Sequence, residues 1–570
     1  MAKHRSARND RSRAFRKGER KRAGRGYADL HEHLDELRRR DLLLTIDRPI
    51  DKDAELHPLV RWQYVGGVEE HERKAFLFTN VVDGRGRRYR FPVVVGAYAG
   101  NRAIYCAGMR ASAEEVEPKW ARAIANPVPP RIVTRAACQE IVIEGNALKG
   151  EGNGLDMLPI PVSTPGFDGA PTLTATNVIT KDPETGIQNQ GTYRAGLKAP
   201  DRLVVRMATR IGGAGGYRHY LKHQKRGDKT MPCAIVLGSP PCVAFVAPMK
   251  LPLDLDEAGV AGGVAGEPIN VVRARTVDLL VPAEAEIVIE GLIDTEYLEP
   301  EGPFGESHGH VALEEFNMPM RVTAITHRRN AIVASYLSQV TPSESSAIKR
   351  VSYEPMFLSH LRSTLGIRGV KAVTLHERMT ALRRIAIVTV EKGTPRTEVW
   401  RALHGTASFK ADCGKICVAV NDDVDPENSD ALLWAIAFRM NPEKDLRVLP
   451  YRSPGHGPER EHVADEPESD ATLLMDATMK EELPPLALPK QEYMERARRI
   501  WEELGLPGLR PQSPWFGTPR GDWLPQWDEG ARRTAEGRYL ENGRISEKLR
   551  RKGLKPETRF RPGAEKKRPR

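Results

Sequence analysis

Glu301-Gly302-Pro303-Phe304-Gly305-Glu306, continued by Ser307-His308-Gly309, follows an alternating stretch at Ala285-Glu286-Ile287-Val288-Ile289-Glu290. The alternation predicts a strand, and the proline and glycines predict a stiff loop after it. Loops braced by a rigid scaffold are where catalytic side chains usually lie. Two acids held close together push their pKa values apart, so that one can remain protonated near neutral pH. Glu301 and Glu306 therefore form a candidate acid pair. The alternative is that the same sequence forms only a solvated acidic turn.

The alternating stretch belongs to a strand-rich segment, residues 131–330. Short apolar runs are separated there by glycine and proline turns, a density of strands that is typical of a barrel. The predicted strands are Glu140–Glu144, Thr172–Thr180, Leu203–Met207, Pro232–Gly238, Thr276–Val281 and Ala285–Gly291.

Mixed helix and strand patterns flank this segment, so the predicted fold class is α/β (α+β). We expect an N-terminal α/β unit over residues 27–130 and a C-terminal α/β domain over residues 331–490. The predicted helices are Tyr27–Arg40, with Leu30, Leu34 and Leu37 at helical spacing, and Asp430–Met440, with Ser429 as its N-cap. The predicted strands of the two units are Leu43–Ile46, Ala75–Val82, Phe91–Val95, Arg384–Val390 and Ile416–Val420.

The net charge of +11 lies at the two ends of the chain. Residues 1–26 and 544–570 each carry a net charge of +9, which leaves the body between them at −7. We expect a basic disordered tail over 1–26, and a helical extension over 491–570 that begins with the amphipathic stretch Tyr493–Leu504 and ends in a second basic tail. The tails are either solubilising ends or contacts to an acidic surface such as RNA or DNA. The aromatic residues that would read bases are few there, which argues against nucleic acid.

The cysteines and the hydropathy of the sequence indicate whether the chain has a zinc site and whether it contacts a membrane. Of six scattered cysteines, Cys413 and Cys417 are closest, and without a second ligand pair we expect buried free thiols rather than a zinc site. The sequence contains no run of about 18 apolar residues, and no secretory apolar region follows its start. The prediction is a cytoplasmic protein without membrane contact.

Three further elements accompany the acid pair. Asn189-Gln190-Gly191-Thr192-Tyr193-Arg194 places an amide and a guanidinium five residues apart around a turn. Ile211-Gly212-Gly213-Ala214-Gly215-Gly216 is a glycine cluster whose amides form a candidate anion nest for a phosphate. Met249 precedes Glu257, which leads into an apolar run. The Glu257 carboxylate is either a charge at a helix N-terminus or a ligand for a hard cation.

Taken together, these motifs resemble the UbiD family of decarboxylases, which use prenylated FMN. The resemblance covers roughly residues 27–490, and Asn421-Asp422-Asp423-Val424 and Trp434-Ala435-Ile436-Ala437-Phe438-Arg439 support it. It implies an FMN-binding split β-barrel over 131–330 and homo-oligomerisation through the domain at 331–490. It also implies Mn²⁺ or a similar divalent ion, K⁺, and a flavin prenyltransferase that supplies the cofactor.

The same resemblance implies roles for individual residues. Asn189 and Glu257 match residues that hold the divalent ion against the cofactor phosphate. The residues that match the cofactor-binding set are Thr192, Tyr193, Arg194, Arg206, Gly212, Gly213 and Met249. Arg194, Glu301 and Glu306 match a catalytic Glu-Arg-Glu triad, in which we expect Glu306 to donate the proton that replaces CO2.

The sequence departs from the family pattern at two positions. Relatives often place a metal-binding histidine where this chain has Gly212, so the third metal ligand stays open, with His219 and His223 as candidates. Many relatives place a lysine that meets the cofactor phosphate where this chain has Thr472, and Lys480 is a candidate substitute.

The predicted function is the reversible, non-oxidative decarboxylation of an aromatic, heteroaromatic or α,β-unsaturated carboxylic acid. Loss of CO2 from an sp² carbon leaves an anion that side chains alone do not stabilise, so a cofactor must act as an electron sink. The substrate and the physiological direction stay open. The alternatives are a subunit of a multi-subunit aryl carboxylase, motivated by the changes at Gly212 and Thr472, and nucleic-acid binding added by the tails.

Overall fold

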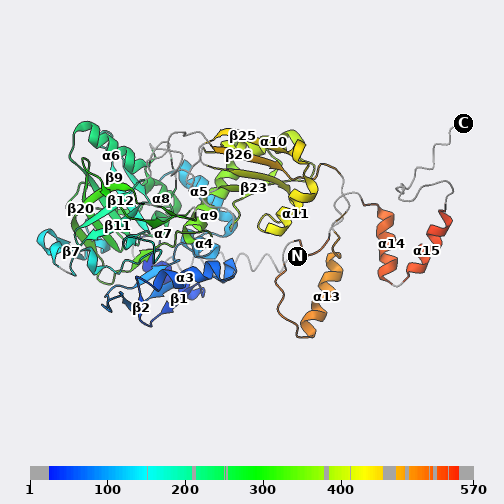
Figure 1. Cartoon of the computed structure of the whole chain (residues 1–570), viewed down its shortest axis with the longest axis horizontal. Helices are drawn as coiled ribbons and strands as arrows, with labels where there is room; N and C mark the ends of the chain where they lie inside the picture. Colours follow the sequence, from blue (N-terminus) through cyan, green and yellow to red (C-terminus); the bar gives the residue numbers. More distant parts are fainter. Residues whose placement is uncertain are drawn as a thin grey trace. The chain divides into compact units, whose positions relative to one another are not determined.

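The structure is a computed structural model that describes residues 25–550, except 151, 208–213, 250, 252–254, 308, 313, 378–383, 411–412, 453–469, 482–484, 486, 512–513, 518–522 and 537. The chain divides into two compact units, Met1–Thr478 and Met479–Arg570. Figure 1 colours the elements in chain order, from blue, where β1 is labelled, to red, where α15 is labelled.

The first unit begins with a small sheet covered by helices. The strand order is β1 (Leu43–Ile46), β3 (Ala75–Phe78), β5 (Val93–Val95) and β21 (Val333–Ser335). The last strand comes from the far end of the central segment, so the N-terminal lobe is completed by residues beyond 330. Helix α2 (Leu30–Arg39) begins at a capping box between Asp29 and Glu32 and buries Leu30, Leu34 and Leu37, as their spacing predicts. The other elements of this lobe are β2 (Ile50–Asp51), α3 (Leu56–Val65), β4 (Val81–Val82), α4 (Arg102–Met109) and α5 (Ala113–Ala125).

The central segment folds into a ten-stranded antiparallel sheet. Its path is β10-β9-β13-β16-β20-β12-β11-β8, and β7 and β17 also pair with β20. The strands are β7 (Ile141–Glu144), β8 (Thr172–Leu173), β9 (Thr176–Lys181), β10 (Gln188–Gly191), β11 (Arg194–Ala199), β12 (Arg202–Arg206), β13 (Thr230–Leu237), β16 (Ile287–Asp294), β17 (Glu299–Pro300) and β20 (Phe316–His327).

The two faces of this sheet follow the alternation of its strands. Ile287 and Ile289 pack into a core with residues of β11, β12 and β20, whereas Val288 between them packs into a separate cluster on the other face. That other face is covered by a three-stranded sheet of β6 (Arg131–Ile132), β14 (Asn270–Arg273) and β15 (Leu280–Pro282). Burial on both faces explains the continuous apolar runs Ala234–Leu237 of β13 and Ile287–Ile289 of β16.

In the described strands the sheet is open between the two ends of its path, β10 and β8. β10 and the last strand but one, β11, lie near these opposite ends, yet only Thr192 and Tyr193 separate them in sequence. Because three Cα steps span at most about 11 Å, the sheet must curl until its two ends nearly meet. The described strands thus form the split barrel that we expected, with the split at Thr192-Tyr193.

The predicted strand Ala75–Val82 is two strands, β3 and β4, which belong to different sheets. Two predicted strands of the central segment also differ from the structure. The stretch Thr276–Val281 is a strand only from Leu280, because the buried Glu290 carboxylate accepts the backbone N–H groups of Arg275 and Thr276 and removes them from strand pairing. The stretch Thr172–Thr180 is interrupted after Leu173, where the Thr174 hydroxyl donates to Tyr336 O at 3.1 Å and so ties the chain to the N-terminal lobe.

The C-terminal lobe is a five-stranded sheet between helices (Figure 1). Ala386 and Val388 of one strand pack with α10, while Ile387 packs with α11, so the two helices cover opposite faces.

The predicted N-cap Ser429 is wrong, because the helix begins there and Asn428 accepts from Asp430 N and Ala431 N. The strand order is β22 (Val370–Thr374), β23 (Ile385–Val390), β24 (Ile416–Asn421), β26 (Asp470–Asp476) and β25 (Leu446–Arg452), with helices α9 (Glu344–Ser359), α10 (Arg396–Ser408), α11 (Ser429–Arg439) and α12 (Pro442–Asp445).

The second unit contains α13 (Gln491–Glu503), α14 (Pro525–Ala535) and α15 (Tyr539–Lys548). The amphipathic stretch Tyr493–Leu504 corresponds to α13. None of the apolar side chains described in this unit is buried. In the described part of the chain as a whole, every helix is too short or too polar to cross a bilayer.

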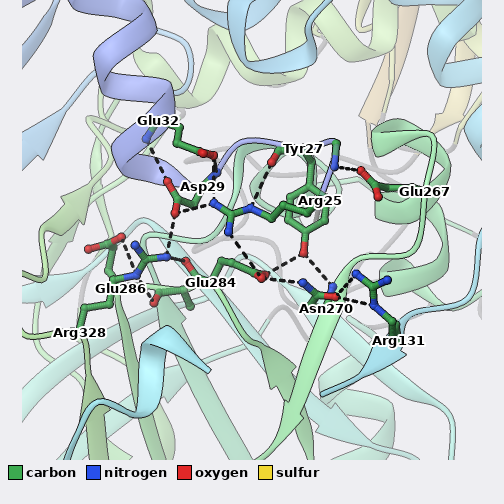
Figure 2. Close-up of polar contacts among 12 residues, drawn as sticks. Arg25, Tyr27, Asp29, Glu32, Arg131, Glu267, Asn270, Glu284, Glu286 and Arg328 are labelled. Atoms are coloured by element: carbon green, nitrogen blue, oxygen red, sulfur yellow. Dashed lines mark hydrogen bonds and ion pairs between the residues drawn. The ribbon is translucent and has the colours of Figure 1, made fainter. Parts of the chain in front are cut away.

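A buried polar network ties the first described residues to the central sheet (Figure 2). The Tyr27 hydroxyl donates to Glu284 Oε2 at 2.8 Å. Arg328 donates from Nη2 to Asp29 Oδ2 at 3.1 Å, and its Nε lies 3.4 Å from Glu286 Oε1. The segment before α2 is therefore anchored on the strand end that leads into β16.

We expect His31 to stabilise this anchor only while it is protonated. Its Nε2 lies 3.0 Å from the fully buried Glu286 carboxylate, and this bond raises the pKa of His31 above its usual value near 6.5. The stabilisation is therefore fully present below about pH 6.5 and is lost as the pH rises through the folded value. His31→Gln should lower the free energy of unfolding by about 1.5–3 kcal/mol at pH 5.5 and by less at pH 9, as measured by urea denaturation. The exposed His71 provides the control, His71→Gln, and equal effects of His31→Gln at both pH values would contradict the prediction.

Candidate active site

Arg194, the first residue of β11, lies between Glu301 and Glu306. Its Nε and Nη2 donate to the two Glu301 oxygens at 2.5 and 2.9 Å, and its Nη1 donates to Glu306 Oε1. The exposed fractions of the three side chains are 9%, 4% and 11%. The sequence suggested that the two acids lie beside each other, but the structure inserts a guanidinium that contacts both.

Further charge and ring contacts complete the surroundings of Arg194. Burial works against its charged form, but the bond to Glu301 and the charges of Glu306 and Glu301 outweigh this and hold the pKa of Arg194 above its usual value. The Phe304 ring centroid lies 4.6 Å from the guanidinium carbon, a cation–π distance. Arg206 Nη1 lies 3.7 Å from Glu306 Oε1, so Glu306 faces two cations.

The carboxylate, the backbone carbonyl and the backbone N–H of Glu301 all form hydrogen bonds. Asn317 Nδ2 donates to Glu301 Oε2 at 3.0 Å, and Lys198 Nζ donates to its backbone carbonyl at 3.1 Å. Its backbone N–H donates to Glu315 O at 2.9 Å. These contacts let Glu301 orient the guanidinium of Arg194.

The loop between the two acids turns sharply at Gly302. Its φ of +96° lies in the region that favours glycine, and the next residues form the short strand β18 (Phe304–Gly305) paired with β19 (Val311–Ala312). This turn reverses the side chain direction after β17, so that Phe304 and Glu306 both reach Arg194.

Thr192 and Tyr193 lie at the split of the sheet. The Thr192 N–H and the Tyr193 carbonyl form hydrogen bonds with Ala247 and Thr176. Thr192 N–H donates to Ala247 O at 3.2 Å, and the Tyr193 carbonyl accepts from Thr176 Oγ1 at 2.5 Å. The Thr192 hydroxyl is buried and has no hydrogen-bond partner among the described residues. A buried orphan hydroxyl is costly unless a ligand satisfies it, so this position fits a polar cofactor group.

Asn189 and Glu257 are in direct contact on the other side of the split. Asn189 Nδ2 donates to Glu257 Oε1 at 2.7 Å, and Gln190 N donates to Oε2 at 3.2 Å. Glu257 is the first residue of α8 (Glu257–Ala265), whose N-cap is Asp256. Burial raises the pKa of Glu257 to about 7, because its partners here are neutral donors. A cation would supply the missing charge, and amide and carboxylate oxygens suit a hard divalent ion. No group of three His, Cys, Asp or Glu side chains able to hold a metal occurs among the residues described.

The glycine cluster is described only in its second half, because Gly212 and Gly213 lie outside the described residues. Gly215 opens helix α6 (Gly215–Arg226), and a Cβ there would lie 2.5 Å from Asn189 Cγ. The helix N-terminus therefore approaches Asn189 closely, and its N-cap, Ala214, offers no side-chain bond. Gly216 N–H donates to the Tyr193 hydroxyl at 3.5 Å. N–H groups at the start of a helix suit a phosphate.

The two histidines of α6 have other partners. His219 Nδ1 lies 2.9 Å from Thr180 Oγ1, and burial lowers the pKa of His219 to about 4. His223 Nδ1 lies 2.8 Å from Asp228 Oδ2. These contacts leave the third metal ligand unassigned.

The remaining predicted residues lie apart from the acid pair. Met249 is buried in the core two residues after Ala247, which accepts the Thr192 N–H. Thr472 lies in β26, where its hydroxyl accepts from Arg452 Nε at 3.1 Å. Cys413 and Cys417 are buried free thiols, as expected.

Sequence reasoning missed the residues that support the acids from elsewhere in the chain. Asn317, Lys198 and Asp168 all bond the loop 301–306. These three residues belong to no recognisable sequence motif, so only the folded structure shows that they contact the loop.

Comparison with known proteins identifies the family. Residues 131–340 match the model described as 3-octaprenyl-4-hydroxybenzoate carboxy-lyase Rift-related domain, UbiD, and residues 348–476 match the corresponding C-terminal domain. The chain belongs to the UbiD family. It is accordingly a carboxy-lyase, and the resemblance seen in the motifs is confirmed.

Several relatives of this UbiD chain span most of its length. An uncharacterized protein of Aquifex aeolicus is 29% identical over 518 residues, which are 85% of this chain and 100% of that protein. The UbiD-class enzyme HmfF of Pelotomaculum thermopropionicum, solved in complex with FMN, is 28% identical with a TM-score of 0.70, covering 80% of this chain and 95% of HmfF. An evolved dimeric form of HmfF in complex with prFMN is 27% identical with a TM-score of 0.67, covering 79% and 95%.

Removing the guanidinium should destabilise the fold strongly. Arg194→Ala leaves two buried carboxylates without their cation, so we expect the free energy of unfolding to fall by about 3–5 kcal/mol. Arg202→Ala is the matched control, because Arg202 lies on the neighbouring strand, is half exposed and pairs with Glu299 at 3.5 Å; it should cost less than about 1 kcal/mol. Denaturant unfolding at pH 7.5 measures both, and similar losses for the two variants would contradict the prediction.

Proposed function

We propose that this UbiD protein decarboxylates an aromatic, heteroaromatic or α,β-unsaturated carboxylic acid, with prenylated FMN and a divalent ion bound and Glu306 as the proton donor. The observation that carries the proposal is the buried Arg194 shared by Glu301 and Glu306, directly after the two residues at the split of the sheet. The HmfF structures that this chain resembles hold FMN or prFMN, which supports the cofactor.

The residues at the split fit the flavin. The orphan hydroxyl of Thr192, the uncapped start of α6 and the Tyr193 ring beside Gly216 offer a polar contact, a phosphate site and a wall. Prenylated FMN, when bound, supplies the electron sink that loss of CO2 from an sp² carbon requires. Arg206, whose guanidinium faces Glu306, lies on β12 beside Arg194 and would bound the same space.

Arg194 retains donors for a substrate carboxylate. A guanidinium has five N–H donors, and Glu301 and Glu306 take three of them. One donor remains on each Nη, so the carboxylate of an aryl acid can be held by charge-assisted bonds close to Glu306. Because Glu301 fixes the plane of the fork, the substrate is oriented as well as bound.

Glu306 is the group best placed to complete the reaction. After the carbon–carboxylate bond breaks, a proton must reach the same carbon, and Glu306 is the acid bonded to Arg194 Nη1, beside one of the two remaining donors, whereas Glu301 is held by a two-point contact to Nε and Nη2. The nearby cations let it return readily to the ionised state after it donates. In the opposite direction the ionised Glu306 would remove the same proton.

Asn189 and Glu257 would hold the divalent ion, for which manganese suits the oxygen donors. The ion would offset the charge of the cofactor phosphate near the start of α6. We further propose homo-oligomerisation through the C-terminal lobe and cofactor supply by a flavin prenyltransferase.

Glu306→Gln tests the proton donor, because glutamine keeps the size of the side chain and cannot donate a carboxylic proton. Turnover of an aryl acid should fall by at least about 100-fold in protein that is co-produced with a flavin prenyltransferase. Released CO2 measures turnover, and flavin and metal contents are determined on the same preparations. The exposed Glu314 nearby gives the control, Glu314→Gln, which should retain normal activity. Near-normal turnover of Glu306→Gln with cofactor and metal bound would exclude Glu306 from this role.

Glu257→Gln tests the metal site. The amide cannot supply the negative charge, so the bound divalent ion per chain should fall at least about tenfold, as measured by elemental mass spectrometry after dialysis. Asp256→Asn is the matched control, because asparagine caps a helix as well as aspartate does and the metal content should stay unchanged. An unchanged metal content in Glu257→Gln would place the ion elsewhere.

A further inference from the structure

The geometry points to Asp168 as the positioning residue that fixes Glu306 against Arg194, an inference that rests on the proposed function. Asp168 Oδ1 accepts the backbone N–H of Gly305 at 3.0 Å, and Oδ2 accepts the backbone N–H of Thr164 at 2.7 Å. Gly305 is the residue immediately before Glu306. One carboxylate thus joins the acid loop to a turn that lies more than 130 positions earlier in the chain.

The neighbouring backbone repeats the same connection. Gly169 N–H donates to Pro303 O at 3.0 Å, so two consecutive residues bond the loop on both sides of Phe304. Gly302 and Gly169 also pack against each other, because a Cβ on Gly302 would lie 3.4 Å from Gly169 Cα. The loop that carries Glu306 is therefore held along its length by the segment 168–169.

There is little space for the loop to shift. A Cβ on Gly305 would lie 2.2 Å from Thr164 Oγ1 and 3.1 Å from Gln339 Cγ. Gln339 Nε2 donates to Thr164 Oγ1 at 3.0 Å, and Arg61 Nη2 donates to Gln339 Oε1 at 2.6 Å. A line of bonded side chains thus runs from α3 to the peptide before Glu306.

Asp168 fills this place as a carboxylate because both of its neighbours are N–H donors. Burial raises the pKa of Asp168, while the bonds from Gly305 and Thr164 oppose this and favour the ionised form. An asparagine would turn its NH2 group toward one of these donors and lose that bond. The substitution is nearly isosteric, so it removes the tie with little change in packing.

Because Asp168 touches neither Arg194 nor Glu306 in any bond of the described residues, its effect on the reaction must pass through the position of Glu306. A misplacement of about 1 Å in a catalytic group can cost up to about 100-fold in rate. We therefore expect Asp168→Asn to lower kcat by about 10- to 100-fold while KM changes less than about threefold, since Arg194 still holds the substrate carboxylate.

The experiment uses the full chain co-produced with a flavin prenyltransferase and compares Asp168→Asn, Asp168→Ala, Glu306→Gln and the double variant Asp168→Asn/Glu306→Gln. The matched control is Asp83→Asn, because Asp83 also accepts two backbone N–H groups, but in an exposed turn. Three readouts are taken: kcat and KM for an aryl acid, exchange of the product C–H in D2O, and amide hydrogen exchange of residues 301–306. The last readout does not depend on catalysis.

Supporting results are slower product C–H exchange in Asp168→Asn, faster amide exchange at Gly305, and a double variant no slower than Glu306→Gln alone. Asp83→Asn should match the parent protein. Unchanged Gly305 exchange in both Asp168 variants would overturn the inference, as would a double variant that loses activity additively. If Glu306→Gln itself keeps normal turnover, the proposed proton donor fails, whereas faster Gly305 exchange would still show that Asp168 holds the loop.

Discussion

The structure depends on one buried guanidinium. Arg194 brings a positive charge into a nearly dry place, and Glu301 and Glu306 offset it with two negative charges. Such a group is costly to bury unless each member keeps its partners, so β11, the loop 301–306 and β20 must all take fixed positions. The loop geometry follows from this requirement: Gly302 supplies the turn, β18 and β19 pair after it, and Asn317 donates a further hydrogen bond to Glu301 Oε2.

The open sheet explains why the chemistry lies where it does. A closed barrel would pair the terminal strands of the path, β10 and β8. Here β10 ends just before Thr192 and β11 begins just after Tyr193, and the Asn189–Glu257 pair and the Arg194 cluster lie on the two sides of these residues, only five positions apart in sequence. A ligand placed beside Thr192 and Tyr193 would therefore meet the Asn189–Glu257 pair on one side and the Arg194 cluster on the other.

Local patterns in the sequence predicted the regular elements well and the long-range contacts poorly. The strand Leu43–Ile46 has the predicted bounds, because alternation and flanking turns are local properties. The predicted strand over Thr276–Leu279 is wrong, because the Glu290 carboxylate accepts the N–H groups of Arg275 and Thr276. No local sequence pattern indicates a partner on another strand. For the site, the motifs contained Arg194, Glu301 and Glu306, but the order of the three groups in space came only from the structure. Asp168 had no signal at all, since its partners are Thr164 and a glycine amide far along the chain.

The choice of arginine at position 194 follows from the number and direction of the bonds that it must make. Lysine has three donors on one atom, and two carboxylates would consume them without fixing a plane. The guanidinium instead places two donors on one edge for Glu301, one for Glu306, and keeps one on each Nη, while its face remains open to the Phe304 ring at 4.6 Å. The same side chain can thus complete the packing of the loop and still present a carboxylate-binding edge. The guanidinium that neutralises two buried carboxylates therefore also carries the N–H groups that they leave unused, so a substitution at Arg194 changes the packing of the loop and these donors together.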